Sequence, residues 1–189
     1  MTYLNLKNIS LKYKFTKNII YKRDVIVHSN RKEAEEIRNK IIDLIKISKV
    51  VLKKQSKLEI SHHYGVENFY KYGLSMITIH NEKYCKKLLF LLENQIHPDQ
   101  FHKKKQETFF VLFGKVKLFL KEKNKKIIKN LSEGDTYTIK PYVVHKFIAN
   151  SKYGAVIEEL STVSSKSDSF YVDKKINRNK DRKTFVSIN

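Results

Sequence analysis

The sequence predicts a mainly β chain with one helix near its N-terminus. Three observations support this fold class. Apolar residues recur at a helical period only between residues 31 and 52, short apolar runs follow Lys57, and glycine or asparagine separates many of those runs. Many short strands joined by tight turns are typical of an antiparallel sandwich or barrel. The length of 189 residues fits one such domain with an appended segment.

Residues 1–60 are predicted to form an N-terminal extension. Short apolar and basic stretches within residues 1–28 predict one or two peripheral strands. An amphipathic helix is expected over about residues 31–52, and Asn30 with Glu33 resembles a capping box at its start. Its apolar face consists of Ala34, Ile37, Ile41, Leu44 and Ile45. We expect this face to pack against the barrel or a second subunit rather than to take part in catalysis.

Residues 61–165 are predicted to form the barrel itself. The strands are expected at Ser75–His80, Lys86–Leu92, Phe101–Lys103, Thr108–Phe113, Lys115–Leu120, Lys125–Asn130, Thr136–Ile139, His145–Ala149 and Ala155–Leu160. Asn94, Gly114, Gly134 and Gly154 are among the turn residues between them. The polar stretch 166–189 has scattered apolar anchors, and we expect it to wrap over the barrel as a tail.

The formal net charge of +20 raises the question of nucleic-acid binding. However, 34 of the 39 basic residues are lysine and only five are arginine, and the lysines are scattered along the chain. Recognition of bases and phosphates favours the bidentate fork of arginine. We therefore predict no nucleic-acid partner, and a positive field that favours a small anionic substrate.

Apolar runs and cysteine content bear on the compartment. No apolar run approaches the roughly 18 residues that span a bilayer, and the first fifteen residues lack the apolar core of a secretion signal. We predict a cytoplasmic protein without a membrane partner. Cys85 is the sole cysteine, so it has no partner for an internal disulfide, and we expect a buried structural thiol.

Two segments carry polar residues at spacings that allow convergence on a metal ion. In the first, 97–114, Gln100 and His102 lie two apart and share one face of an extended chain, while Glu107 opens the next strand. In the second, 134–147, a turn and a proline loop precede His145. Imidazole nitrogens with a carboxylate suit a divalent ion such as Mn, Fe, Ni or Zn.

These two segments resemble the two signatures of the cupin superfamily. The spacings from His102 to Glu107 and from Glu107 to Gly114 fit the first signature, and Gly134, Pro141 and His145 fit the second. The resemblance spans about residues 74–162 and implies a double-stranded β-helix, also called a jelly-roll barrel. It also implies a homodimer and a metal held by Gln100, His102, Glu107 and His145.

The chain departs from the cupin pattern at two positions. Asn94 stands at the first glycine, which is acceptable because asparagine also adopts left-handed backbone angles. Gln100 stands at the first histidine, and its amide oxygen is a weaker ligand than imidazole. His97, which precedes Pro98, is expected at the mouth of the barrel, either as partial compensation for this replacement or as a catalytic or substrate contact.

Further candidate residues flank the two signatures. Glu158 and Glu159 are successive residues of one strand, so one carboxylate is expected to face inward as a general base. The candidates for substrate contact are Tyr137, Tyr142, His63 and Lys104. Each has a plain alternative: the tyrosines as strand packing, His63 as a loop residue, and Lys103–Lys105 as a solvated turn.

The resemblance implies an enzyme that acts on a small carbohydrate or keto-sugar acid, preferably as an isomerase or epimerase. A wider likeness, from Ser61 to a segment near Asp168 and Arg182, is to cupin domains associated with sialic-acid-type synthases and surface-sugar biosynthesis. In the preferred scheme Glu158, Glu159 or His97 moves a proton. The alternatives are a non-catalytic sugar-binding or regulatory module, which the replacement by Gln100 favours, and an iron-dependent dioxygenase.

Overall fold

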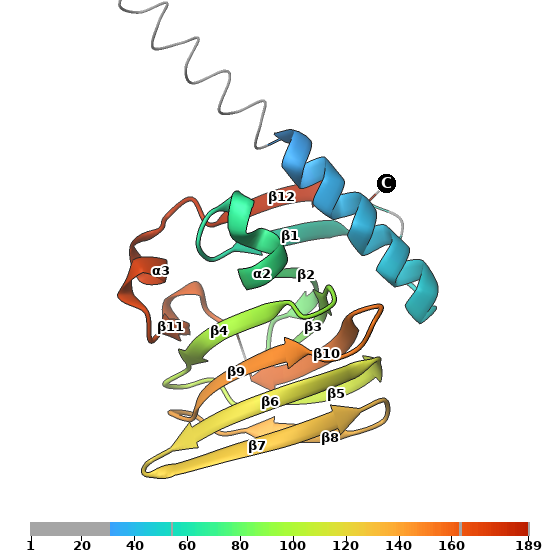
Figure 1. The fold of residues 1–189 in the computed structure, drawn as a ribbon. Coiled ribbons are helices and arrows are strands. Elements are labelled where there is room, and N and C mark those ends of the chain that lie inside the picture. The colour runs from blue at the N-terminus through green and yellow to red at the C-terminus, as the bar shows by residue number, and fades with distance from the viewer. Residues whose placement is uncertain (1–30, 54, 163, 189) are drawn as a thin grey trace, which may run out of the picture.

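Two antiparallel β-sheets pack face to face in the computed structural model (Figure 1), which describes residues 31–53, 55–162 and 164–188. The larger sheet has the order β12 (Lys183–Ser187), β1 (Lys57–His62), β2 (Gly73–Asn81), β3 (Tyr84–Leu91), β10 (Ala155–Thr162), β5 (Glu107–Phe113) and β8 (Thr136–Ile139). The smaller sheet has the order β11 (Phe170–Tyr171), β4 (Ile96–Phe101), β9 (Val144–Ala149), β6 (Lys115–Glu122) and β7 (Lys125–Ser132).

Helices are short apart from the one over residues 31–48. The others are the 3-10 turns η1 (Val66–Asn68) and η2 (Lys166–Asp168) and the helices α2 (Phe69–Tyr72) and α3 (Lys174–Arg178). None of the helices in the described ranges is long and apolar enough to cross a membrane.

The strand β3 explains how one sheet supports two cores. Its run of apolar residues is buried on both faces, as expected for a strand covered on both sides. Leu89 and Leu91 point into the core between the two sheets, where they join Phe109 and Phe147. Leu88 and Phe90 point to the outer face, where the long helix lies.

The helix over residues 31–48 covers that outer face with the side chains that its period predicts. Ala34, Ile37, Ile41 and Leu44 are buried there. In Figure 1 the helix crosses the sheet beside β1 and β12. It ends before the predicted Leu52 because Lys49 has a φ of 56°, a left-handed backbone that stops a helix. The strands expected within residues 1–28 and the capping residue Asn30 lie outside the described residues.

One predicted strand is misplaced and three strands were missed. The strand expected at Phe101–Lys103 is instead β4, Ile96–Phe101, and it contains Pro98 beside a register irregularity in its pairing with β9. The missed strands are β1, β11 and β12. Since β12 pairs with β1, the tail adds a strand to the larger sheet.

The turn at Asn94 confirms the interpretation of that residue. Its φ is 57°, so asparagine occupies the left-handed conformation for which cupin sequences use glycine. Cys85 is buried and free, as expected for a structural thiol.

Candidate metal centre and active site

Three ligand-type side chains from distant segments meet between the sheets. His102 follows β4, Glu107 begins β5 and His145 lies on β9. One potential ligand atom from each lies within 4.8 Å of the other two, and all three side chains are buried. The pairing of β9 with β4 brings the two histidines together, and Glu107 reaches them from β5 of the larger sheet, which packs against the smaller one.

Backbone carbonyl groups hold the Nδ1 atoms of the two histidines, so that their Nε2 atoms point to the centre. His102 Nδ1 donates to the backbone carbonyl of Asp168, and His145 Nδ1 donates to that of Val143 at 3.1 Å. Both Nε2 atoms face Glu107 Oε1, at 3.5 Å from His102 and 2.9 Å from His145.

A cation would satisfy the polar atoms that lack a partner at this centre. Burial lowers the pKa of His102, which keeps its imidazole neutral, and its Nε2 and Glu107 Oε1 have no hydrogen-bond partner among the described residues. Carbonyl groups that hold the outer nitrogens of histidine ligands are a regular feature of metal sites. Two imidazoles and a carboxylate thus fit a divalent metal ion, and the chemistry of the donor set does not select one ion.

Gln100 lies beside this centre. Its Nε2 is 3.2 Å from His145 Nε2, and the side chain is buried. A rotation of the amide by 180° exchanges its oxygen and nitrogen, which would turn the oxygen toward the same imidazole nitrogen and the centre. The position therefore suits an amide-oxygen ligand.

A buried chain of charges connects the centre to a second carboxylate. Lys105 Nζ lies 2.6 Å from Glu107 Oε2 and 2.8 Å from Glu159 Oε1, and Lys87 Nζ lies 3.3 Å from the same Glu159 oxygen. Burial alone would raise the pKa of both glutamates, but the lysines outweigh burial and hold both values below the usual range. Both carboxylates are therefore ionised at neutral pH.

The position of Lys105 corrects the interpretation of Lys103–Lys105 as a solvated turn. Lys103 and Lys104 are exposed, but the Lys105 side chain is only 5% exposed. The physical reason is Asp168, whose carboxylate accepts hydrogen bonds from the backbone amides of all three lysines. These hydrogen bonds turn the backbone inward, so that the Lys105 side chain reaches Glu107.

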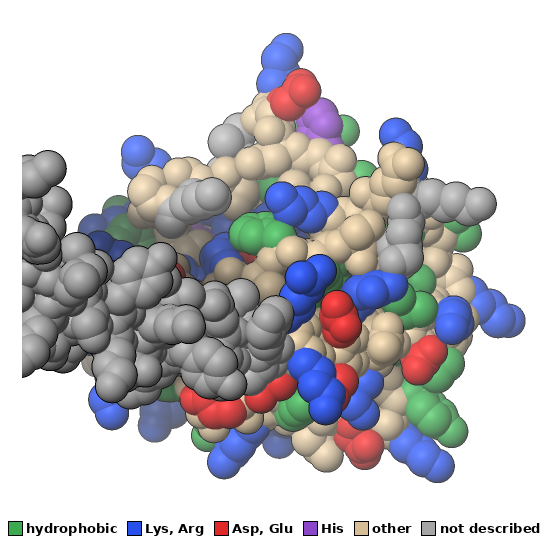
Figure 2. Space-filling model, turned by 90° about the horizontal axis from the view of Figure 1, so that it is seen from above, with side chains coloured by type: hydrophobic (Ala, Val, Ile, Leu, Met, Phe, Trp, Pro, Cys, Tyr) green, Lys and Arg blue, Asp and Glu red, His purple; other side chains and the backbone are tan. Residues whose placement is uncertain are grey.

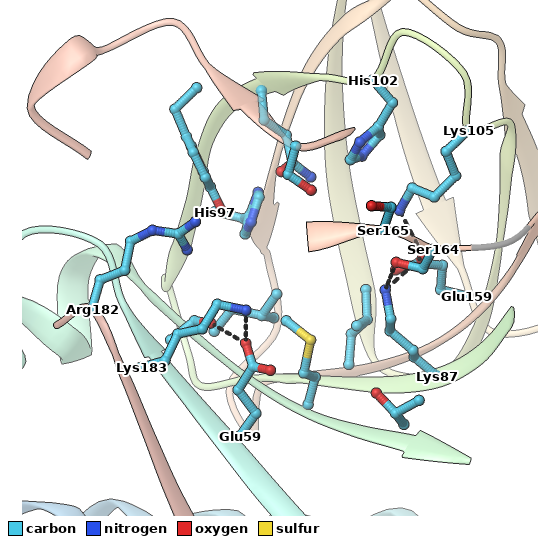
Figure 3. A pocket seen from close by; sticks show the side chains of 18 of the residues that line it. Glu59, Lys87, His97, His102, Lys105, Glu159, Ser164, Ser165, Arg182 and Lys183 are labelled. Carbon is cyan, nitrogen blue, oxygen red and sulfur yellow. Dashed lines mark hydrogen bonds and ion pairs between the residues drawn. The ribbon is translucent and has the colours of Figure 1, made fainter. Parts of the chain in front are cut away.

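A cavity opens beside the centre. Its volume of about 410 Å³ lies within the range of small-molecule sites. His97, Gln100, His102 and Glu159 line it, together with Lys105. Figure 3 shows His102, Lys105 and Glu159 on one side of the pocket and Arg182 with Lys183 on the other. The walls come from both sheets and from the tail.

His97 is a buried, neutral member of the pocket wall. Its ring stacks on Phe147 with centroids 4.7 Å apart, and burial holds its pKa well below the usual value. His63 contacts the ring of His97 edge-on at 4.9 Å between centroids. His63 itself is bonded to the Tyr72 carbonyl and the Tyr171 hydroxyl, so it supports the wall and does not line the cavity.

The remaining predicted residues lie away from the cavity lining. Tyr137 packs against the core between the sheets, and Tyr142 is 67% exposed. Lys104 is exposed as well. Glu158 points to the face of β10 opposite Glu159 and pairs with Lys86 at 2.9 Å. Tyr142 contributes through its backbone, because its amide donates to the His102 carbonyl at 2.7 Å.

Four residues of the site escaped the sequence interpretation, namely Lys87, Lys105, Asp168 and Arg182. Lys105 had a signal, since it stands two residues before Glu107 and can share its face. Asp168 and Arg182 lie in the tail, far from both signatures in sequence. No local pattern marks a residue that reaches a site only through the fold of a distant segment.

The comparisons with known proteins point to sugar isomerases and to the cupin fold. No family model matches the chain. A D-lyxose ketol-isomerase of Thermofilum sp. (strain ex4484_79) is 27% identical over 170 residues, covering 76% of this chain and 93% of that protein. A D-lyxose/D-mannose isomerase of Thermosediminibacter oceani is 26% identical over 173 residues, covering 78% and 95%.

Solved structures show the same architecture. L-ribose isomerase of Cellulomonas parahominis matches with a TM-score of 0.64 at 15% identity, covering 78% of this chain and 94% of that one. L-ribose isomerase of Acinetobacter sp. DL28 in complex with L-ribose matches with a TM-score of 0.64 at 14% identity over the same shares. The chain has the cupin fold, a mainly β jelly roll with an N-terminal helix, as the sequence predicted.

Proposed function

We propose that this protein is a metal-dependent sugar isomerase that interconverts an aldose and the corresponding ketose. The observation that carries the proposal is the buried group of two imidazoles and a carboxylate, in which His102 Nε2 and Glu107 Oε1 have no hydrogen-bond partner among the described residues, placed beside a cavity of sugar size. The similarity to D-lyxose and D-mannose isomerases over most of the chain supports the same reaction class. We take the metal to be held by His102, Glu107 and His145, with Gln100 as a further ligand.

A bound divalent ion would polarise the sugar carbonyl and the neighbouring hydroxyl, which makes the hydrogen on the adjacent carbon more acidic. The residues of the chain supply the rest of the reaction. The ionised Glu159 carboxylate accepts the proton from C2 and returns it to C1, while the hydroxyl proton moves from O2 to O1. Lys105 and Lys87 fix this carboxylate by ion pairs. No oxidant or reductant is needed, because the hydrogens only change place.

We further propose a small, negatively charged sugar as the substrate and a homodimer as the assembly. The net charge of +20 supports the first part, and the cupin resemblance supports the second. Lys and Arg side chains are spread over the face seen in Figure 2, with Asp and Glu among them. Such a surface attracts anions in general, so selection must take place inside the pocket.

Metal removal provides the direct test of this function. We expect about one divalent ion per chain by elemental analysis, and we expect chelation to abolish exchange of the C2 hydrogen of D-lyxose, D-mannose or the anionic D-mannose 6-phosphate with solvent deuterium. Addition of Mn, Fe, Ni or Zn to the stripped protein should restore the exchange with at least one ion. Glu107→Gln should lose both the ion and the exchange. A purified protein without metal that gains no exchange with any of the four ions would refute the proposal.

A further inference from the structure

Five cationic side chains line the pocket, and three of them are neutralised by ion pairs. Lys87 and Lys105 share the two carboxylates Glu159 and Glu107. Lys183 pairs with Glu59, which also lines the pocket. The local charges of these groups cancel, so they form the wall without making the pocket positive.

The two remaining cations are Arg182 and Lys180, which the tail brings to the pocket between α3 and β12. Within the described ranges, neither forms an ion pair with a protein carboxylate. Arg182 is half-buried and Lys180 is exposed at the rim. The pocket therefore has unneutralised positive charge at this side.

Arg182 is held in place before any ligand binds. Its guanidinium lies over the ring of Tyr171, 5.1 Å from the centroid, and the Tyr171 hydroxyl is fixed by His63 Nε2 at 3.0 Å. The backbone carbonyl of Arg182 accepts a hydrogen bond from the His62 amide at 2.8 Å. Figure 3 shows the guanidinium directed into the pocket, across from His102, Lys105 and Glu159.

We infer that Arg182, with Lys180, binds an anionic group at the end of the sugar that is remote from the reacting carbons. The substrate class is then an aldose or ketose that carries a terminal phosphate ester or carboxylate. A planar guanidinium fits either group through two parallel hydrogen bonds, and a neutral hydroxymethyl group would leave this charge without a partner. This inference rests on the proposed function for the reaction, but the anion site itself can be tested without turnover.

The test compares sugars that differ only at the terminal carbon. Values of kcat/KM are measured for D-mannose, D-mannose 6-phosphate and D-mannuronate, which also separates phosphate from carboxylate as the preferred group. We expect one of the two anionic sugars to exceed D-mannose. Arg182→Gln should lower that preference roughly 10- to 100-fold, mainly through KM, because a charge-assisted hydrogen bond is lost. Arg182→Lys should keep part of it.

A control variant and a binding measurement separate failure of the anion site from failure of the isomerase proposal. Arg178→Gln, in the exposed part of α3, is the matched control and should leave the preference unchanged. Calorimetry with D-mannitol 1-phosphate and D-mannitol measures the anion site without a reaction. If the phosphate binds more tightly in an Arg182-dependent manner while no sugar is isomerised, the anion site stands and the isomerase proposal fails. If kcat/KM for D-mannose equals that for the anionic sugars, and D-mannitol binds with the same affinity as D-mannitol 1-phosphate, the inference is overturned and the isomerase proposal stands.

Discussion

Glu158 and Glu159 are adjacent in sequence but face opposite environments. Glu158 pairs with Lys86 on the outer face of β10, while Glu159 lies in the pocket between Lys87 and Lys105. The alternation of a β-strand causes this difference, because successive side chains point to opposite faces. The pair therefore offers a reactive position and its own control.

We expect Glu159→Gln to lower kcat by about 10²- to 10⁴-fold, since the amide cannot accept the proton. The metal content should stay the same, because Glu159 contacts Lys105 rather than the ligand atoms. Glu158→Gln, with the same chemical change on the outer face, should leave kcat unchanged. Solvent deuterium exchange and elemental analysis of both variants are the measurements, and equal losses of kcat in the two would remove Glu159 from its role.

At this scale the sequence predicted that His102, Glu107 and His145 converge, through the likeness of two separate segments to cupin signatures, and their atoms do lie within 4.8 Å of one another. Lys105 was misjudged as solvated. Three consecutive lysines are usually exposed, and only the carboxylate of Asp168, more than sixty positions away, turns this one inward. A distant partner of that kind has no local signature.

The short element η2 holds the loop that carries His102, a candidate metal ligand. Asp168 at its end accepts from the amides of Lys103, Lys104 and Lys105, and its own carbonyl accepts from His102 Nδ1. These backbone donors hold the pKa of the Asp168 carboxyl below its usual range, against the effect of burial. One residue thus fixes both the backbone of the loop and the orientation of the imidazole.

We expect Asp168→Asn to weaken metal binding about 10- to 100-fold, as loss of an outer support to a ligand commonly does. The amide cannot serve as acceptor for three backbone donors as well as a carboxylate does. Asp173→Asn is the control, because Asp173 caps α3 in the same tail and contacts Tyr64 instead of the loop. Competition with a chelating dye measures both affinities, and similar values for the two variants would contradict this role.

At the scale of elements, strands with clear alternation and glycine turns were predicted within one or two residues, and β8 was predicted at its observed bounds. The predicted position of β4 is wrong because Pro98 interrupts the strand pattern of residues 96–101, and the prediction included the lysine that follows His102 instead. Strands β11 and β12 form by pairing with β4 and β1. Their short sequences therefore lack a local pattern that predicts a strand.

For the whole molecule, burial of His63 couples stability to pH. Burial lowers the pKa of His63 to about 4 from 6.5, and the hydrogen bond to the Tyr72 carbonyl only partly opposes this effect. Between these two pH values the unfolded chain binds more protons than the folded one, so the free energy of unfolding decreases as the pH falls. The loss begins near pH 6.5 and levels off below pH 4.

We expect His63 to contribute a loss of about 2 kcal/mol in unfolding free energy between pH 7.5 and pH 5. Urea unfolding at both pH values measures the change for the natural protein and for His63→Gln, which cannot titrate. The pH-dependent loss should be smaller in the variant by about that amount. Identical losses in the two proteins would show that His63 titrates alike in the folded and unfolded chains.

The tail has a consequence for how the protein matures during synthesis. Asp168 supports His102, a candidate ligand that lies more than sixty positions before it in the chain, while Arg182 lines the pocket and β12 pairs with β1. A nascent chain that has emerged only as far as β10 has every ligand residue but lacks the support for His102. A chain that ends at Thr162 is therefore expected to bind a metal ion at the proposed centre more weakly than a chain that includes Asp168.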